Sequence, residues 1–113
     1  MGIEAILIAF LGAAGLPAPA GSTAPEEWPA SFYTVERTGG AGDFRMDRPT
    51  VAVQAWAPTL ADAERLIAAA DRAILAGLAD GAPVTSCRRV GLARFPVDGK
   101  PRYQALYSIT MYA

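Results

Sequence analysis

Residues 102–112, RYQALYSITMY, decide the fold class, because their side chains alternate in character at every second position. A β-strand points successive side chains to opposite faces of a sheet, so this period is typical of a strand that buries one face. The stretch therefore predicts a strand whose apolar face another layer must cover. That face would carry Tyr103, Ala105, Tyr107, Ile109 and Met111.

Three further segments are rich in β-branched and aromatic residues and predict strands: 31–37 (SFYTVER), 50–57 (TVAVQAWA) and 84–95 (VTSCRRVGLARF). The Gly-rich segment 38–43 predicts a flexible turn, too long for a two-residue hairpin loop, so we expect its tip to project. The sequence PVDGKP at 96–101 predicts a second turn, and Gly91 predicts a β-bulge.

Residues 3–16, IEAILIAFLGAAGL, predict a helix that is apolar on two sides. It lacks the positively charged start of a signal peptide, and its apolar run of about 12 residues falls short of the roughly 20 that span a membrane. We interpret it as a core helix whose second face meets another subunit. The core stripe would be Ile3, Ile6, Leu7, Phe10, Leu11 and Ala14, and the second face Ala5, Ile8, Ala9, Gly12 and Ala13.

Residues 60–78 predict a second helix, with Thr59 as its N-cap, Asp62 in its first turn and a stop at 80–83. The element order is then α-β-β-α-β-β. Two β-hairpins that join in one antiparallel sheet, with both helices on one face, make an α+β two-layer sandwich. We expect a single domain over residues 1–113. Within it, the Pro-rich segment 17–30 would be an ordered connector or short edge segment, anchored by Trp28.

The composition excludes most small-enzyme chemistry. The chain has no His and one Cys, Cys87, which removes His-based acid–base catalysis, Cys–His nucleophiles, Cys/His zinc sites and an intrachain disulfide. We expect neither an enzyme nor a bound cofactor or metal. Hydrophobic residues make up 52% and charged residues 19%. This apolar fraction is high for a small monomer and indicates surface that is buried in an assembly.

Three local features invite a chemical interpretation and favour a structural one. Cys87 lies beside two Arg residues, which could activate a thiolate, but in a predicted strand it is better read as a small buried hydrophobe. Asp43 and Asp47 match no calcium-loop spacing, which favours a solvated loop. The glycines at 39–42 precede a strand rather than a helix, so no helix N-terminus is available to bind phosphate.

Charge is sorted along the chain although the net charge is only -1. Residues 1–30 carry three acids and no base, whereas residues 83–113 carry five basic residues against one acid. The basic final hairpin could be solvated edge charge, could dock on an acidic part of a neighbouring copy, or could track a phosphate backbone.

Two stretches carry a resemblance to a known family: FYTVERTGG at 32–40 and DRPTVAVQAWA at 47–57. With the apolar first helix, the Pro-rich connector and PRYQ at 101–104, they resemble the tail-terminator (tail-completion) proteins of long-tailed bacteriophages, of the lambda type. The resemblance covers nearly the whole chain.

The resemblance implies a structural virion protein at the tail–neck junction, assembled in the host cytoplasm. Such proteins form hexameric rings that cap the tail tube, stop its growth and present a surface to the head-side connector, while DNA only passes through the lumen. It implies homo-oligomer, tail-tube and connector partners and no membrane. Ring–ring contacts would fall on Arg37, Gly39, Gly40, Asp43, Phe44, Arg45 and Arg48, and subunit or lumen contacts on Ala5, Ile8, Ala9, Arg88, Arg89 and Arg94.

Other classes stay open at this point. A different neck (head–tail connector) component would share the same features, and a small-molecule-binding or regulatory α+β domain would show a closed pocket with converging polar groups. A secreted protein that keeps its first segment is a further alternative.

Overall fold

The computed structural model describes residues 2–23, 26–27 and 30–113, so the expected anchor Trp28 lies outside the described residues. The elements follow the predicted order with one addition, a two-residue strand in the connector. They are α1 (Ile3–Ala13), β1 (Ala20–Gly21), β2 (Phe32–Gly42), β3 (Met46–Trp56), α2 (Leu60–Gly77) with the 3₁₀ turn η1 (Leu78–Asp80), β4 (Val84–Arg94) and β5 (Arg102–Tyr112).

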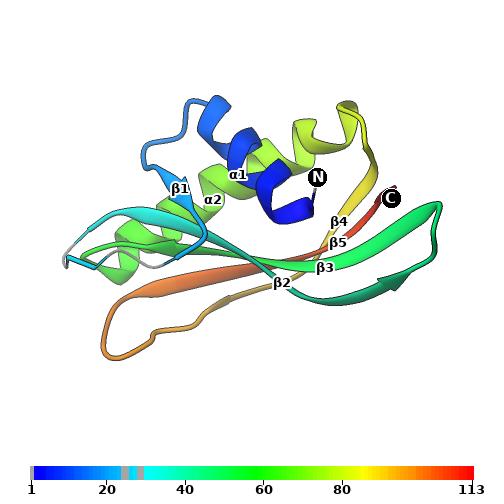
Figure 1. Ribbon diagram of the computed structural model, residues 1–113. Helices are drawn as coiled ribbons and strands as arrows, with labels where there is room; N and C mark the ends of the chain where they lie inside the picture. The colour runs from blue at the N-terminus through cyan, green and yellow to red at the C-terminus, as the bar shows by residue number, and fades with distance from the viewer. Residues whose placement is uncertain (1, 24–25, 28–29) are drawn as a thin grey trace.

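The strands form one five-stranded sheet in the order β1-β2-β3-β5-β4. Both helices lie on the same side of it (Figure 1). The α+β class is confirmed, but the prediction of a purely antiparallel sheet is wrong, because β1 pairs parallel to β2. The connector can do this since Pro19, which lacks an N–H, still accepts a hydrogen bond from the Tyr33 N–H at 2.8 Å, and an edge position tolerates proline.

β5 occupies the predicted residues 102–112 and pairs with β3 on one side and β4 on the other. Its predicted apolar face is the buried one, with Tyr107 fully buried. Tyr33 on β2 is also fully buried, and its hydroxyl donates to the Leu66 carbonyl on α2 at 2.6 Å, which joins sheet and helix. The core further contains Ile3, Leu7, Leu11, Val51, Val53, Ile67, Ile74 and Ile109.

The opposite side of the sheet is held by a polar ladder. The Thr34 hydroxyl donates to Gln54 Oε1 at 2.7 Å, and Gln54 Nε2 donates to Gln104 Oε1 at 3.1 Å. The Trp56 indole N–H donates to Thr34 Oγ1 at 2.9 Å. Because Thr34 and Gln54 are each only 5% exposed, these bonds replace the water that the side chains lose on burial.

Both helices end earlier than predicted. α1 stops at Ala13 because Gly15 takes a left-handed conformation (φ 70°), which ends a helix at little cost for glycine. α2 stops at Gly77, and the chain continues in the 3₁₀ turn η1. The predicted N-cap is confirmed, since Thr59 Oγ1 accepts the Asp62 N–H at 3.1 Å.

The first hairpin differs most from its prediction. The glycines at 39–42 belong to β2 rather than to a turn, so β2 and β3 extend together and the turn is confined to residues 43–45. Gly40 has a φ of 97°, and a Cβ there would lie 2.1 Å from the Arg48 carbonyl oxygen, so only glycine fits this close strand pairing.

The second hairpin is as expected. Asp98 and Gly99 both have positive φ, at 51° and 73°, between bridged Val97 and Lys100, which is the geometry of a tight two-residue turn. The predicted bulge is present as a register shift between Arg89 and Gly91.

Candidate assembly surfaces

The paired ends of β2 and β3, residues 37–48, form an arm that reaches one end of the molecule (Figure 1). Arg37 braces it from within: its two Nη atoms donate to the two carboxylate oxygens of Asp47, at 2.7 and 2.9 Å, and its Nε donates to the Gly39 carbonyl at 3.0 Å. The side-chain hydrogen bond from Arg37 lowers the pKa of Asp47. The Arg37 backbone N–H donates to Glu4 Oε2 of α1 at 3.2 Å, which ties the base of the arm to the helix layer.

The tip of the arm has a fixed shape and presents one large apolar side chain. Asp43 Oδ1 accepts the N–H groups of Met46 (2.9 Å) and Arg45 (2.8 Å), and these bonds lower the pKa of the carboxyl. The Ala113 N–H donates to the Arg45 carbonyl at 2.9 Å. Phe44 is left 84% exposed, with the Arg45 guanidinium 5.2 Å from its ring centre.

The seven residues predicted for ring–ring contacts therefore lie together on the arm. This geometry gives no support to the other interpretations of the segment, a calcium site at Asp43 and Asp47 or a phosphate-binding loop at the glycines. The carboxylates of Asp43 and Asp47 are engaged within the arm, and the glycines at 39–42 are paired with β3. Phe44 and Arg45 are the predicted residues that face outward at the tip.

The predicted basic residues on β4 do not form one patch. Arg88 pairs in register with Ser108, whereas Arg89 and Arg94 pair with Tyr107 and Tyr103, whose side chains face the helices. Arg88 thus lies on the opposite side of the sheet from the other two.

Arg89 has a partner within the chain. Its Nη1 donates to Asp71 Oδ2 at 2.7 Å, and the other oxygen of Asp71 accepts the Tyr107 hydroxyl at 2.7 Å. Burial raises the pKa of Tyr107 above its ordinary value of 10.0. This network joins α2 to the edge strand, a tertiary link that no local sequence pattern indicates.

The outward face of α1 is apolar, and the described residues leave it uncovered. Ala5 and Ala9 are exposed, and Ile8 is half-buried against the edge of the core. The exposure agrees with a helix that has two apolar sides.

Cys87 has the environment of a structural residue. It is half-buried and packs against the core, and burial, followed by the charge of Asp71, raises its pKa to about 11. A thiol with this pKa is not activated at neutral pH. Within the described ranges, no three potential ligand side chains gather to hold a metal, and none of the described helices is long and apolar enough to cross a membrane.

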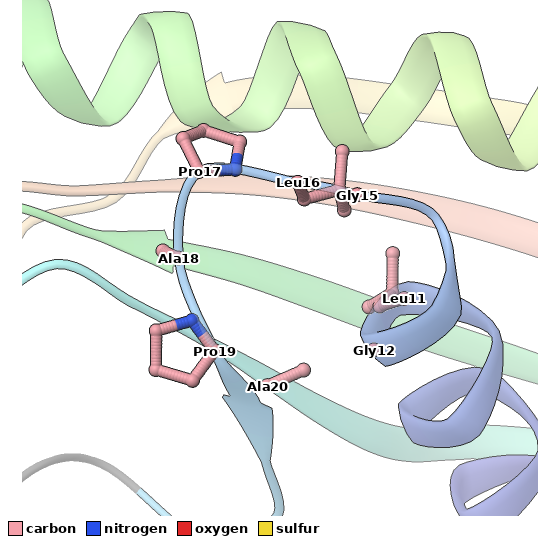
Figure 2. A pocket seen from close by; sticks show the side chains of 8 residues that line it. All are labelled: Leu11, Gly12, Gly15, Leu16, Pro17, Ala18, Pro19 and Ala20. Carbon is pink, nitrogen blue, oxygen red and sulfur yellow. The ribbon is translucent and has the colours of Figure 1, made fainter.

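A groove at the end of α1 was not predicted. It has a volume of about 490 Å³ and lies between the last turn of the helix and the chain that leads into β1. Figure 2 shows Leu11 and Gly12 on one side, with Pro19 and Ala20 across from them. Gly15, Leu16, Pro17 and Ala18 complete the described lining, which carries no charge. The run of glycines and prolines after the helix was its signal in the sequence, but only the fold of the connector turns that run into a groove.

The sequence matches no protein-family model and shows no significant similarity to curated protein sequences. Its structure is similar to a chain in the solved structure of the virion of a native gene transfer agent (GTA) particle. The match has a TM-score of 0.54 and 13% sequence identity, and it covers 98% of this chain and 87% of the other. At this identity the likeness shows a common fold that runs along nearly the whole chain.

Proposed function

We propose that this protein is a non-enzymatic structural subunit of a phage-like virion and, within that class, a tail terminator. The observation that supports the class is the fold shared with a chain of a gene transfer agent virion over 98% of the residues. The stretches 32–40 and 47–57 carry the resemblance to tail terminators. They include the parts of β2 and β3 at the base of the arm.

In this proposal the subunits form a ring, most simply a hexamer, through head-to-tail contacts. The exposed Ala5 and Ala9 of α1, together with Ile8, contribute to the contact between copies. Arg88 and Arg94 of β4 face a neighbouring subunit or the lumen through which DNA passes. The arm makes axial contacts with the neighbouring ring, and its braced Arg37–Asp47 pair keeps it extended for that purpose.

The mechanism is geometric. One face of the ring blocks addition of the next tail-tube ring, and the other face binds the head-side connector. The protein is then located in the virion at the tail–neck junction, after assembly in the host cytoplasm. Another neck component is the alternative, since the same fold likeness would suit it.

A reconstituted tube-growth assay separates these two roles. A terminator added to polymerising tail-tube protein stops elongation at substoichiometric amounts and is found at one tube end by electron microscopy. A different neck component would bind the connector and leave tube length unchanged, and that result would overturn the terminator assignment.

Variants test the α1 contact in the same assay. Ile8→Glu places a charge on the outward apolar face and is expected to abolish ring formation. Ala76→Glu places the same charge on an exposed position of α2 and serves as the matched control. Rings of Ile8→Glu that form as readily as those of the control would remove α1 from the subunit contact.

A further inference from the structure

We infer that the groove at the C-terminal end of α1 receives Phe44 from the arm of a second copy of this chain. The inference deepens the proposed function, on which it rests only in requiring that copies associate. It assigns the tip of the arm to the seam between two copies and leaves the flanks of the arm for the neighbouring ring.

The first argument is the match between a projecting side chain and a hollow. Phe44 is the most exposed of the large hydrophobic side chains in the described chain, at 84%, and the Asp43 turn holds it in place. The groove offers about 490 Å³, which is ample for a phenyl ring, and it is lined by uncharged side chains together with backbone groups. Burying an aromatic side chain is among the largest single gains available to an interface.

The second argument is charge. The last turn of α1 has no basic side chain within the described helix, so the partial negative charge of its free carbonyl groups is uncompensated by the helix itself. Arg45 follows Phe44 in the chain, and its guanidinium lies 5.2 Å from the centre of the Phe44 ring. A Phe44 side chain bound beside Gly12 and Gly15 of another copy therefore brings the Arg45 guanidinium to a helix end that has no basic side chain.

The third argument is placement. The arm reaches one end of the molecule, away from β1 and the C-terminal end of α1 (Figure 1), and the Ala113–Arg45 hydrogen bond holds its tip there. Phe44 therefore does not reach the groove of its own chain, but it can reach the groove of a second copy. A contact of this kind joins two different surfaces, so it repeats from copy to copy and closes a ring when the rotation between copies allows.

Gly12 provides a variant that blocks the groove without harming the fold. A Cβ at Gly12 has no atom within 4 Å, and glycine is a poor residue inside a helix. Gly12→Leu is therefore expected to keep or raise the thermal midpoint of the subunit while filling the hollow. The matching variant on the other surface is Phe44→Ala, which removes the exposed aromatic side chain that is proposed to enter the groove.

Sedimentation velocity of the full-length chain over a concentration series tests the contact. Each of the two variants is expected to weaken self-association at least about tenfold, because each removes the burial of one aromatic side chain. Arg45→Gln is expected to give a smaller loss and a weaker dependence on salt. Leu75→Ala removes an apolar side chain of 49% exposure elsewhere and should leave association unchanged.

Disulfide trapping tests the geometry directly. In a Cys87→Ser background, a mixture of Arg45→Cys subunits, which keep Phe44, with Gly12→Cys subunits should form covalent dimers on mild oxidation. A mixture of Gly12→Cys with Val90→Cys subunits should not. The groove contact is overturned if both Gly12→Leu and Phe44→Ala still associate as wild type does. It is also overturned if copies associate but no dimers are trapped. Either result leaves the proposed ring itself untouched. A wild-type chain that stays monomeric at every concentration overturns both.

Discussion

The Tyr107 hydroxyl on β5 donates to Asp71 of α2 at 2.7 Å, and the same carboxylate binds Arg89 at 2.7 Å. Tyr107 is fully buried, so its hydroxyl has lost water and depends on this bond. Asp71→Ala is expected to cost about 1–3 kcal/mol of unfolding free energy, since it leaves a buried donor unpaired. Tyr107→Phe should cost less, because Asp71 keeps Arg89. Urea denaturation at neutral pH measures both, and an Asp71→Ala variant as stable as wild type would contradict the network's role.

Stability is expected to fall in alkaline solution because buried groups must lose protons. Burial raises the pKa of Tyr33 from 10.0 to about 12 and that of Cys87 from 9.0 to about 11. A group whose pKa is raised in the folded state contributes stability in full below its ordinary pKa and loses it as the pH rises through the folded value. The free energy of unfolding should therefore decline from about pH 9 to about pH 12.

The Tyr33→Phe variant isolates one part of this dependence. It removes the hydrogen bond to the Leu66 carbonyl and should lower stability near neutral pH by about 1 kcal/mol. It should also flatten the decline above pH 10, since one titrating group is gone. Urea midpoints measured at several pH values check this, and an unchanged slope in the variant would show that Tyr33 does not contribute.

Gly40 and Gly39 are neighbours with opposite requirements. Gly40 has a φ of 97° and no room for a Cβ, whereas a Cβ at Gly39 meets nothing within 4 Å. Gly40→Ala is expected to destabilise by about 1–3 kcal/mol or more through backbone strain and the clash with β3. Gly39→Ala should change stability by less than about 0.5 kcal/mol. Thermal unfolding of the pair checks this, and equal effects would contradict the strand pairing through the glycines.

How far the sequence predicts this structure depends on whether the responsible interactions are local. β5 and α2 were predicted almost to the residue, because side-chain alternation, a helical apolar stripe and the Thr59 cap act within a few positions. The Asp98–Gly99 turn belongs to the same group.

Elements decided by distant partners were predicted poorly. The glycines at 39–42 have the composition of a turn, yet β3 supplies hydrogen-bond partners that hold them in a strand. β1 depends on β2 for its pairing, and the groove depends on the path of the connector after α1. The sequence indicates the arm residues as contact residues, but that Asp43 fixes the turn and Phe44 projects from it follows only from the folded hairpin.

The polar ladder on the helix-free side of the sheet makes a further prediction. Gln54 is only 5% exposed and bonds to both Thr34 and Gln104, so it links β2, β3 and β5. Gln54→Ala leaves these neighbours without their partner and should cost about 1–3 kcal/mol, whereas Gln54→Glu should cost more because it adds a buried charge. The Glu variant should regain stability as the pH falls and its carboxyl is protonated. Urea denaturation at pH 7 and pH 4 separates the two variants: recovery by the Glu variant alone is expected, and equal behaviour at both pH values would mean that water reaches this side chain.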